Sequence, residues 1–310
     1  MNGKAAKKRG RPVSGWIILD KPKGLFSTEA VSRVKWLYNA EKAGHAGTLD
    51  PLASGLLPIA LGEATKTVPY VMDGVKSYQF TVVWGAERTT NDLEGEVIKV
   101  SHQRPTTEDI KALLPEYIGL ILQTPPQYSA IRINGLHAYT LARSGKRVAI
   151  PPREVKINAL DLIRITSEGH AVFEIECGKG TYIRSLARDM GYALGCYGYV
   201  ADLRRFGVFP FTADDFITFA ELEEACPSRS DFSLLDAFLL ETSVALKSLP
   251  HYAIVDKKMA DRICSGNPVF LHGRQQEKLR EADRIYVRHK GRILAIGYIS
   301  KGAFQPTRVF

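Results

Sequence analysis

Short runs of apolar, β-branched and aromatic residues predict strands in two separate parts of the chain. Some of these runs alternate between apolar and polar positions, as strands with one buried face do. After residue 250 the character changes, because brief β-rich runs follow one another across glycine-containing turns. Residues 250–310 are therefore expected to form a small β-barrel. The predicted strands include residues 16–19, 78–84, 171–177, 284–288 and 293–299.

Apolar residues at helical spacing predict helices between these strands. A first helix should be capped by Ser27 or Thr28, a second should cover residues 105–122, and a third should begin near Thr181 and stop at Gly195. Residues 211–249 are acidic and are also expected to be helical, with a capping box at Thr218-x-x-Glu221. Strands and helices together predict an α+β protein.

The net charge of the chain indicates a binding partner. The 310 residues carry a net charge of +9 and a sequence pI near 9.3, while 45% of them are hydrophobic. Such a basic globular protein is expected to bind a polyanion, and nucleic acid is the first candidate. Residues 1–13 contain several lysines and arginines and no acid. They are expected to form a disordered tail, which either leans on RNA phosphates or has no function.

Cysteine and histidine spacing argues against metal and disulfide chemistry. The four cysteines contain no C-x-x-C pair, and the seven histidines contain no H-x-x-x-H pair. We therefore expect no metal site and a reducing, cytoplasmic location. No apolar run reaches membrane-spanning length, and the N-terminus lacks the apolar segment of a signal peptide, so no membrane partner is expected.

One carboxylate stands out. The stretch His45-Ala-Gly-Thr-Leu-Asp-Pro-Leu-Ala-Ser-Gly-Leu-Leu-Pro58 holds Asp50 among small and apolar residues. Pro51 pushes Asp50 out of the α region, and the leucines are too apolar for a solvated loop. A carboxylate that packs against a hydrophobic core must form an ion pair, be protonated, or take part in the chemistry of a site. The alternative is a structural Asp-Pro turn between two buried segments.

A second segment, residues 123–153, interleaves basic and aromatic side chains. This composition suits an element that grips RNA, because cations neutralise phosphates and rings meet unstacked bases. The alternative is a solvated loop with a short amphipathic helix. The basic residues are Arg132, Arg143, Lys146, Arg147 and Arg153, and the aromatic partners are Tyr128, His137 and Tyr139.

Arg184 would lie in the first turn of the helix that follows Gly178-Lys-Gly180, beside Tyr182. A cation there opposes the helix dipole, so a partner anion is expected, although an exposed surface arginine is the ordinary alternative. Tyr78 begins a predicted strand and either faces a site or is an ordinary aromatic of the sheet. Leu203 by itself would be assigned to the core.

These residues fall in motifs that resemble the TruB family of pseudouridine synthases. Gly-x-Leu-Asp-Pro contains Asp50, Lys-x-Tyr ends at Tyr78, Gly-Thr-Tyr-Ile-Arg ends at Arg184, and Leu-Arg-Arg begins at Leu203. A Lys-Pro-x-Gly segment at residues 21–24 also matches and is expected to brace the catalytic loop. In the family's Thr-Asp-Thr segment, Thr90 and Asp92 match, whereas Arg88 and Thr89 depart, which affects contacts around that loop rather than the chemistry.

The resemblance implies a pseudouridine synthase fold, with a mixed, mainly antiparallel central sheet flanked by helices. Residues 14–249 would form the catalytic domain, in which residues 123–153 are the thumb insertion that grips the tRNA arm. Residues 250–310 would form a PUA-like RNA-binding domain. The partner implied is the T-arm of tRNA, with no guide RNA and no cofactor, and the chain is expected to act as a monomer.

The resemblance also implies the reaction and the roles of the site residues. A uridine at position 55, in the T-loop of tRNA, would be flipped out and isomerised to pseudouridine. Asp50 would act as nucleophile or assist base departure, and Arg184 would keep it ionised. Tyr78 would stack on the uracil and take a sugar proton in a glycal pathway, which stays open beside the covalent one. His45 would fill the space of the flipped nucleotide, and Tyr182 and Leu203 would wall the site.

Two other functions fit part of the sequence. One is a non-catalytic RNA-binding or tRNA-folding chaperone, which the presence of Asp50, Tyr78 and Arg184 argues against. The other is a guide-RNA-dependent enzyme, and the thumb insertion at residues 123–153 favours the stand-alone form because guide-dependent relatives lack it.

Overall fold

The computed structural model describes residues 10–133, 135–145, 148–227, 230–271, 279 and 282–310. Its centre is an eight-stranded sheet in the order β1-β3-β12-β4-β11-β10-β7, with β2 paired to β3. Every neighbouring pair is antiparallel except β12 with β3, so the predicted mixed, mainly antiparallel sheet is confirmed. The strands are β1 Gly15–Lys21, β2 Ala43–His45, β3 Ser54–Leu61, β4 Lys76–Trp84, β7 Gly119–Gln123, β10 Arg153–Ile165, β11 Ala171–Cys177 and β12 Gly198–Val208.

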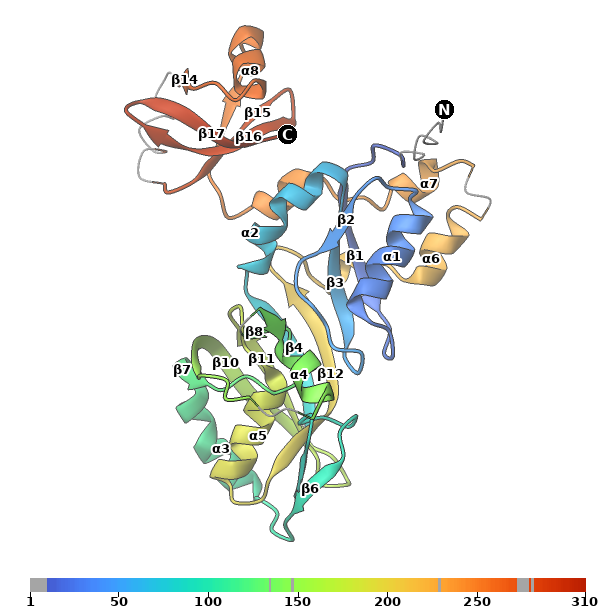
Figure 1. Cartoon of the computed structure of the whole chain (residues 1–310), viewed down its shortest axis with the longest axis vertical. Coiled ribbons are helices and arrows are strands. Elements are labelled where there is room, and N and C mark those ends of the chain that lie inside the picture. The colour runs from blue at the N-terminus through green and yellow to red at the C-terminus, as the bar shows by residue number, and fades with distance from the viewer. Residues whose placement is uncertain (1–9, 134, 146–147, 228–229, 272–278, 280–281) are drawn as a thin grey trace.

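Helices pack on this sheet through apolar faces. Helix α1, Ser27–Leu37, buries Ala30, Val34 and Leu37 on the core beside β2 and β3, and α5, Ile183–Ala193, packs against β12. Figure 1 shows α1 beside β1 and β3, and α5 near α3, Thr107–Leu113. The segments that carry Asp50 and Arg184 thus lie next to neighbouring strands of one sheet, β3 and β12.

Two predicted helix boundaries were wrong. The cap of α1 is Phe26, whose amide donates to the Glu29 carboxylate at 3.1 Å, because Ser27 is buried and uses its hydroxyl elsewhere. The helix predicted over 105–122 ends early, as α3 followed by a 3-10 turn, Leu114–Tyr117. Residues 119–123 instead form β7, because their exposure alternates and β10 supplies an edge with which to pair.

The predicted helical region 211–249 is only partly helical. Its capping box is confirmed, since the Thr218 amide donates to the Glu221 carboxylate at 2.8 Å and the Glu221 amide donates to the Thr218 hydroxyl at 3.3 Å. The helices there are short pieces joined by extended chain. They are η3 Ala213–Asp215, α6 Phe219–Glu224, α7 Ser233–Asp236 and η4 Thr242–Leu246.

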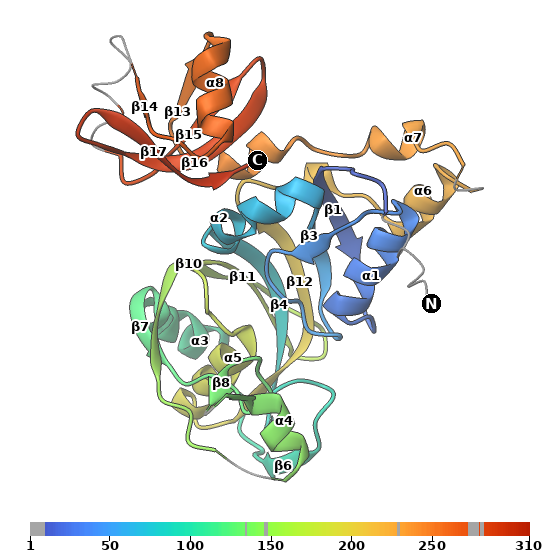
Figure 2. The same ribbon diagram turned by 45° about the horizontal axis from the view of Figure 1, so that its top comes forward.

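The C-terminal sheet is a second body with its own core. It has five strands in the order β13-β15-β16-β17-β14, and it stands apart from the main sheet in Figures 1 and 2. The sheet is curled, as expected for a PUA-like barrel. Its contacts with the main body include a hydrogen bond of 2.7 Å from the Lys66 ammonium to the Val309 carbonyl. Its elements are β13 His251–Ile254, α8 Lys257–Cys264, β14 Val269–Phe270, β15 Ile285–His289, β16 Arg292–Ser300 and β17 Ala303–Val309.

The start of the described chain is more ordered than the predicted tail. Residues 1–9 lie outside the described part, but Arg11 pairs with both carboxylate oxygens of Asp236 at 2.8 and 2.5 Å and stacks over Phe232. The expectation of disorder is therefore wrong for residues 10–13. The other elements of the main body are η1 Gly62–Thr67, α2 Val68–Met72, β5 Ala86–Arg88, β6 Val97–Val100, β8 Arg132–Ile133, β9 Leu136–His137 and α4 Ala138–Arg143.

Candidate active site

Asp50 lies on the loop between β2 and β3, and the backbone on both sides of it is fastened to the turn after β1. The Ser27 hydroxyl donates to the Leu49 carbonyl at 2.8 Å and accepts from the Leu49 amide at 2.9 Å. The Gly24 amide donates to the Pro51 carbonyl at 2.7 Å. The predicted bracing of the loop by the Lys-Pro-x-Gly segment is thus confirmed.

Lys21 strengthens the same brace from beneath. Its side chain is fully buried, and its ammonium donates to the carbonyls of Pro22 and Leu25, each at 2.9 Å. Burial lowers the pKa of Lys21 to about 8, although the nearby charge of Asp50 raises it. Burying a cation whose partners are mainly backbone carbonyls costs free energy. Lys21 is therefore interpreted as a group that fixes the position of the Asp50 loop.

Arg184 is the expected partner of Asp50. Its Nε lies 2.8 Å from Asp50 Oδ2, and its two terminal nitrogens donate to the carbonyls of Thr90 at 3.0 Å and Tyr128 at 2.9 Å. The residue is 6% exposed, so the surface-arginine alternative is wrong and the predicted anion partner is confirmed. Asp50 also makes the predicted turn, because its carbonyl accepts from the Ala53 amide at 3.1 Å. The turn leaves its carboxylate, 38% exposed, free to face a substrate.

A second carboxylate, Asp92, was missed as a site residue. It is 2% exposed, and its Oδ2 lies 3.6 Å from Arg184 Nε, while its Oδ1 accepts from the Glu94 amide at 3.0 Å. Arg184 Nε is therefore shared by two carboxylates, one buried and one partly exposed. The match of Thr90 and Asp92 to the family's motif was the available signal. The departing residues Arg88 and Thr89 hydrogen-bond within their own hairpin segment, to Gly95 and Glu96.

Tyr78 is the third residue of β4 rather than the first, and it is partly buried against the main core. Burial raises its pKa, with the Arg205 guanidinium opposing this shift and the Asp50 charge adding to it. Burial likewise raises the pKa of Tyr182, which the Asp50 charge also raises. Both rings therefore lie within electrostatic reach of Asp50. Leu203 is 7% exposed on β12, opposite Phe80 of β4.

His45 ends β2, five residues before Asp50. Its Nδ1 is buried and has no hydrogen-bond partner in the described structure. Burial and the positive charge of Arg205 both lower the pKa of His45, so its ring is neutral at pH 7. A neutral ring suits the predicted role of occupying the space of a base.

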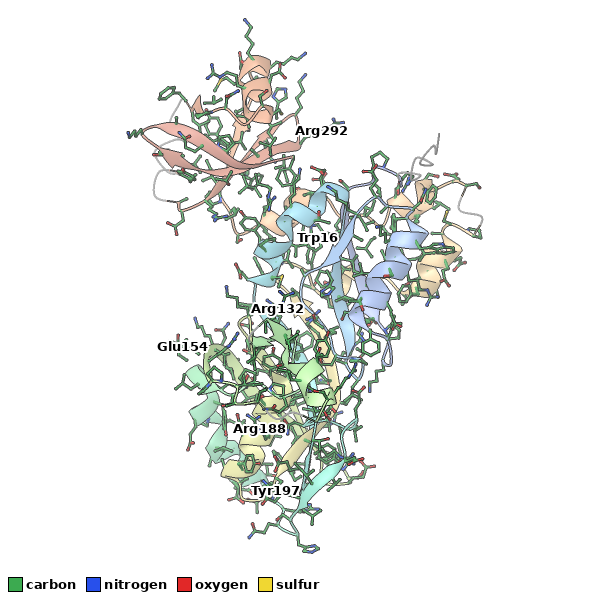
Figure 3. The ribbon with its side chains drawn as sticks, viewed as in Figure 1. Trp16, Arg132, Glu154, Arg188, Tyr197 and Arg292 are labelled. Carbon is green, nitrogen blue, oxygen red and sulfur yellow. The ribbon has the colours of Figure 1, made fainter. Side chains whose placement is uncertain are left out.

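The thumb, residues 123–153, lies beside α5 in both Figures 1 and 2. Its base is fastened there, since the Gln123 amide group exchanges hydrogen bonds of 2.8 and 3.1 Å with the Tyr182 backbone. The carbonyl of Thr124 accepts from Ser185 at 2.8 Å and from Arg188 at 2.9 Å. Figure 3 shows Arg188 on α5 and Arg132 on the thumb.

Among the predicted RNA contacts of the thumb, the structure describes three. Arg132, Arg143 and Arg153 have exposed side chains, and the guanidinium of Arg143 stacks 5.7 Å from the ring centre of Tyr139. Lys146 and Arg147 lie outside the described residues. Exposed cations beside rings fit the predicted RNA grip, which stays a prediction.

In the described ranges, no three histidine, cysteine, aspartate or glutamate side chains gather as they would around a metal ion. All four cysteines are free thiols, of which Cys264 is exposed. No helix of the described chain is long and apolar enough to cross a membrane.

The chain has a pseudouridine synthase fold, as superposition on solved structures shows. The solved Cbf5-Nop10-Gar1 complex contains a chain that superposes with a TM-score of 0.73 and 25% identity, covering 95% of this chain and 84% of that one. An archaeal box H/ACA sRNP Nop10-Cbf5 complex superposes with a TM-score of 0.69 and 24% identity, covering 95% and 85%.

Sequence comparison narrows the class. A family model described as the TruB family pseudouridylate synthase N-terminal domain matches residues 35–183, and one described as the tRNA pseudouridylate synthase B C-terminal domain matches residues 184–247. Two curated proteins named tRNA pseudouridine synthase B, from Brucella anthropi and Mesorhizobium japonicum, are 57% and 56% identical. The alignments cover 98% and 99% of both partners. The chain belongs to the TruB family, and it is an enzyme that isomerises uridine in tRNA to pseudouridine.

Proposed function

We propose that this enzyme isomerises the uridine at position 55, in the T-loop of tRNA, with Asp50 as nucleophile and without a guide RNA. The observation that carries the proposal is the ion pair of 2.8 Å between Asp50 and the buried Arg184. It presents one carboxylate, oriented and partly exposed, on a braced loop. The T-loop target and the nucleophile are what the family motif around Asp50 implies.

The reaction is an isomerisation in which atoms balance. The bond between N1 and the ribose C1′ breaks, the uracil turns, and a bond forms between C5 and C1′. C5 loses a proton and N1 gains one. In the covalent pathway Asp50 attacks C1′ and expels the uracil anion, and C5 later displaces the carboxylate. In the glycal pathway Asp50 assists base departure while C2′ loses a proton to the ionised form of Tyr78, and that proton returns to C2′ when C5 bonds to C1′ of the glycal.

The charge state of Tyr78 suits the stacking role. Burial raises the pKa of its phenol, so the ring is protonated and neutral at pH 7. A neutral ring stacks on a base, whereas a proton acceptor would have to ionise first. Tyr78 is therefore assigned to stacking on the uracil, with Tyr182 and Leu203 as walls. His45 would fill the gap that the flipped nucleotide leaves, at an unstacking cost of a few kcal/mol.

Arg184 orients Asp50 before the substrate arrives. Its hydrogen bonds to the carbonyls of Thr90 and Tyr128 leave the guanidinium little freedom to turn, and the Asp92 carboxylate lies near the same Nε that pairs with Asp50. A carboxylate held in this way does not need to reorganise when the reaction begins. The thumb insertion and the C-terminal sheet supply further RNA-binding surface, which supports a stand-alone enzyme.

The proposal is tested with the purified chain and unmodified tRNA alone, followed by mapping of pseudouridine. We expect product at position 55, and none on a tRNA in which that uridine is replaced by cytidine. The Asp50→Asn variant should lose more than about 10³-fold in rate while tRNA affinity stays close to wild type, because Asn keeps the shape but is a very poor nucleophile. Tritium release from uridine labelled at C5 measures the rate, and filter binding measures the affinity.

Asp161→Asn is the matched control, since Asp161 is an exposed carboxylate on β10. It should turn over at the wild-type rate. Near wild-type turnover by Asp50→Asn would mean that Asp50 is not the nucleophile. Loss of both binding and activity in a folded Asp50→Asn protein would return Asp50 to the role of a structural turn residue. Product that forms only after addition of a guide RNA would overturn the stand-alone assignment.

A further inference from the structure

Arg205 is a buried arginine that the reaction as described above does not use. It lies on β12 beneath the catalytic loop and is 1% exposed. Within the described residues no carboxylate lies within 4.0 Å of it, so its charge is not part of an ion pair. Burying a guanidinium without a counter-ion is costly, and an apolar side chain of similar length would pack more cheaply. The role of Arg205 is therefore expected to depend on the N–H donors of its guanidinium, which an apolar side chain lacks.

Those donors connect the two ends of the Asp50 loop. The Arg205 Nε donates to the Leu56 carbonyl at 2.7 Å, and one terminal nitrogen donates to the Gly47 carbonyl at 3.0 Å. Gly47 precedes Asp50 by three residues, and Leu56 follows it by six. One planar guanidinium thus spans the base of the loop, as a forked group with several fixed donors is able to do.

The backbone of Arg205 fixes the same geometry from the strand side. In the sheet register Arg205 is opposite Gly55 of β3 and opposite Tyr78 of β4. The approach to Gly55 is so close that a Cβ there would lie 2.1 Å from the Arg205 carbonyl oxygen, and Gly55 has a φ of +99°. β12 thus lies between β3, which follows the catalytic loop, and the strand of Tyr78, and Arg205 is in register with both.

The guanidinium also reaches the aromatic groups of the site. Its carbon lies 6.0 Å from the centre of the Tyr78 ring, and its charge acts on both Tyr78 and His45. The Asp50 loop is thus held by Arg205, and Tyr78 and His45 lie within the field of its charge.

We propose that Arg205 is a positioning residue, which sets the distance between the Asp50 loop and the Tyr78 ring. The inference rests on the proposed roles of Asp50 and Tyr78. Arg205 does not touch the reacting atoms, so its loss should impair the chemical step and leave tRNA binding intact. A displacement of about 1 Å at a reacting group costs about 10²-fold in rate.

The test compares Arg205→Met, which keeps the stem and removes the donors, with Arg205→Lys, which keeps the charge but lacks the fork. Single-turnover rates at saturating tRNA should fall about 10²-fold in the Met variant, with the dissociation constant for tRNA within about twofold of wild type. The Lys variant should be intermediate, because an ammonium reaches one carbonyl but cannot span both. Arg204→Met is the matched control, since the neighbouring Arg204 pairs with Asp20 on the other side of the strand.

Each outcome decides the proposal. Rate loss with intact binding and partial rescue by Lys supports it. A folded Met variant with the wild-type rate overturns it, and so does a variant that loses rate and binding together or one in which Lys restores nothing. If Met does not fold, the Lys variant carries the test, and a Lys variant that also fails to fold assigns Arg205 to folding alone. Asp50→Asn run in parallel separates the two proposals, because an active Asp50→Asn protein sinks the nucleophile assignment itself.

Discussion

The Asp50 loop and the thumb both carry residues assigned to the substrate, but they hold them in opposite ways. Around Asp50, the supporting groups Lys21, Arg184 and Arg205 are buried, and each is fastened to two or more backbone carbonyls. On the thumb, Arg132 and Arg143 are exposed. Chemistry at one carbon needs atoms fixed in advance, whereas contacts with flexible phosphates need charge that can adjust.

The two regions meet at α5. Arg184 donates to the Tyr128 carbonyl in the thumb segment and pairs with Asp50 in the loop, while Ser185 and Arg188 hold the Thr124 carbonyl. The start of the thumb is therefore fastened to the helix that carries Arg184, whereas Arg132 and Arg143 further along are exposed. The comparison predicts large catalytic effects from buried changes and binding effects from exposed ones.

Among the groups that support Asp50, the largest effect is expected from Arg184→Gln. Asp50 and Asp92 would lose their shared cation, so the single-turnover rate should fall about 10³-fold. Breaking a buried ion pair costs about 3–5 kcal/mol, and the lower end applies because Asp50 is 38% exposed. Denaturant unfolding and tritium release measure the two effects. Arg33→Gln, which removes a more exposed ion pair with Glu223 on α6, is the control. A wild-type rate in Arg184→Gln would contradict the expectation that buried groups around Asp50 control the catalytic rate.

The thumb should respond in binding. Replacing Arg143, Lys146 and Arg147 with alanine is expected to weaken tRNA binding about tenfold or more and to flatten the plot of log affinity against log salt by about 2–3 units. The catalytic rate at saturating tRNA should be nearly unchanged. Lys111→Ala on α3 is the control for a general change of charge. An unchanged salt slope would show that these three residues do not contact phosphate.

The contribution of buried Lys21 to the stability of the fold should depend on pH. The pKa of Lys21 is about 8 in the folded chain and 10.5 ordinarily, so between these values the unfolded chain binds one more proton than the folded chain. The free energy of unfolding therefore rises with pH in this window, by at most about 1.4 kcal/mol per unit. Wild type should become more stable relative to Lys21→Met between about pH 8 and pH 10. Exposed Lys23→Met is the control, and a difference that does not change with pH would contradict the prediction.

The smallest effect is expected from an exposed ion pair. Lys179 and Asp73 lie 2.8 Å apart with side chains 70% and 63% exposed. Such a pair is worth about 0–1 kcal/mol, because water and salt screen it. Lys179→Ala should therefore leave the thermal midpoint close to wild type, also at high salt. A loss of stability as large as that of Arg184→Gln would show that burial does not separate the two kinds of pair.

Local patterns predicted the elements whose environment is simple. The strands at 16–19, 78–84 and 171–177 are confirmed. Their alternating or fully apolar residues bury their side chains most readily on one or both faces of a sheet. The helix predicted over 105–122 was wrong from residue 119 onward, because the edge of β10 gives those residues a pairing partner that lies more than thirty positions away. The prediction that Ser27 or Thr28 caps helix α1 was wrong for a similar reason, since the Ser27 hydroxyl hydrogen-bonds with the backbone of Leu49.

The sequence by itself determined that Asp50 lies in an unusual loop, that Arg184 needs an anion, and that the chain carries a basic, aromatic insertion. Each follows from neighbours close in the chain, through proline and glycine geometry, the helix dipole and charge. Only the tertiary structure decided that Asp92 shares Arg184 and that Arg205 spans the loop from Gly47 to Leu56. Those contacts join residues about 90 to 160 positions apart, and a buried charge finds its partners only when the sheet has closed around it.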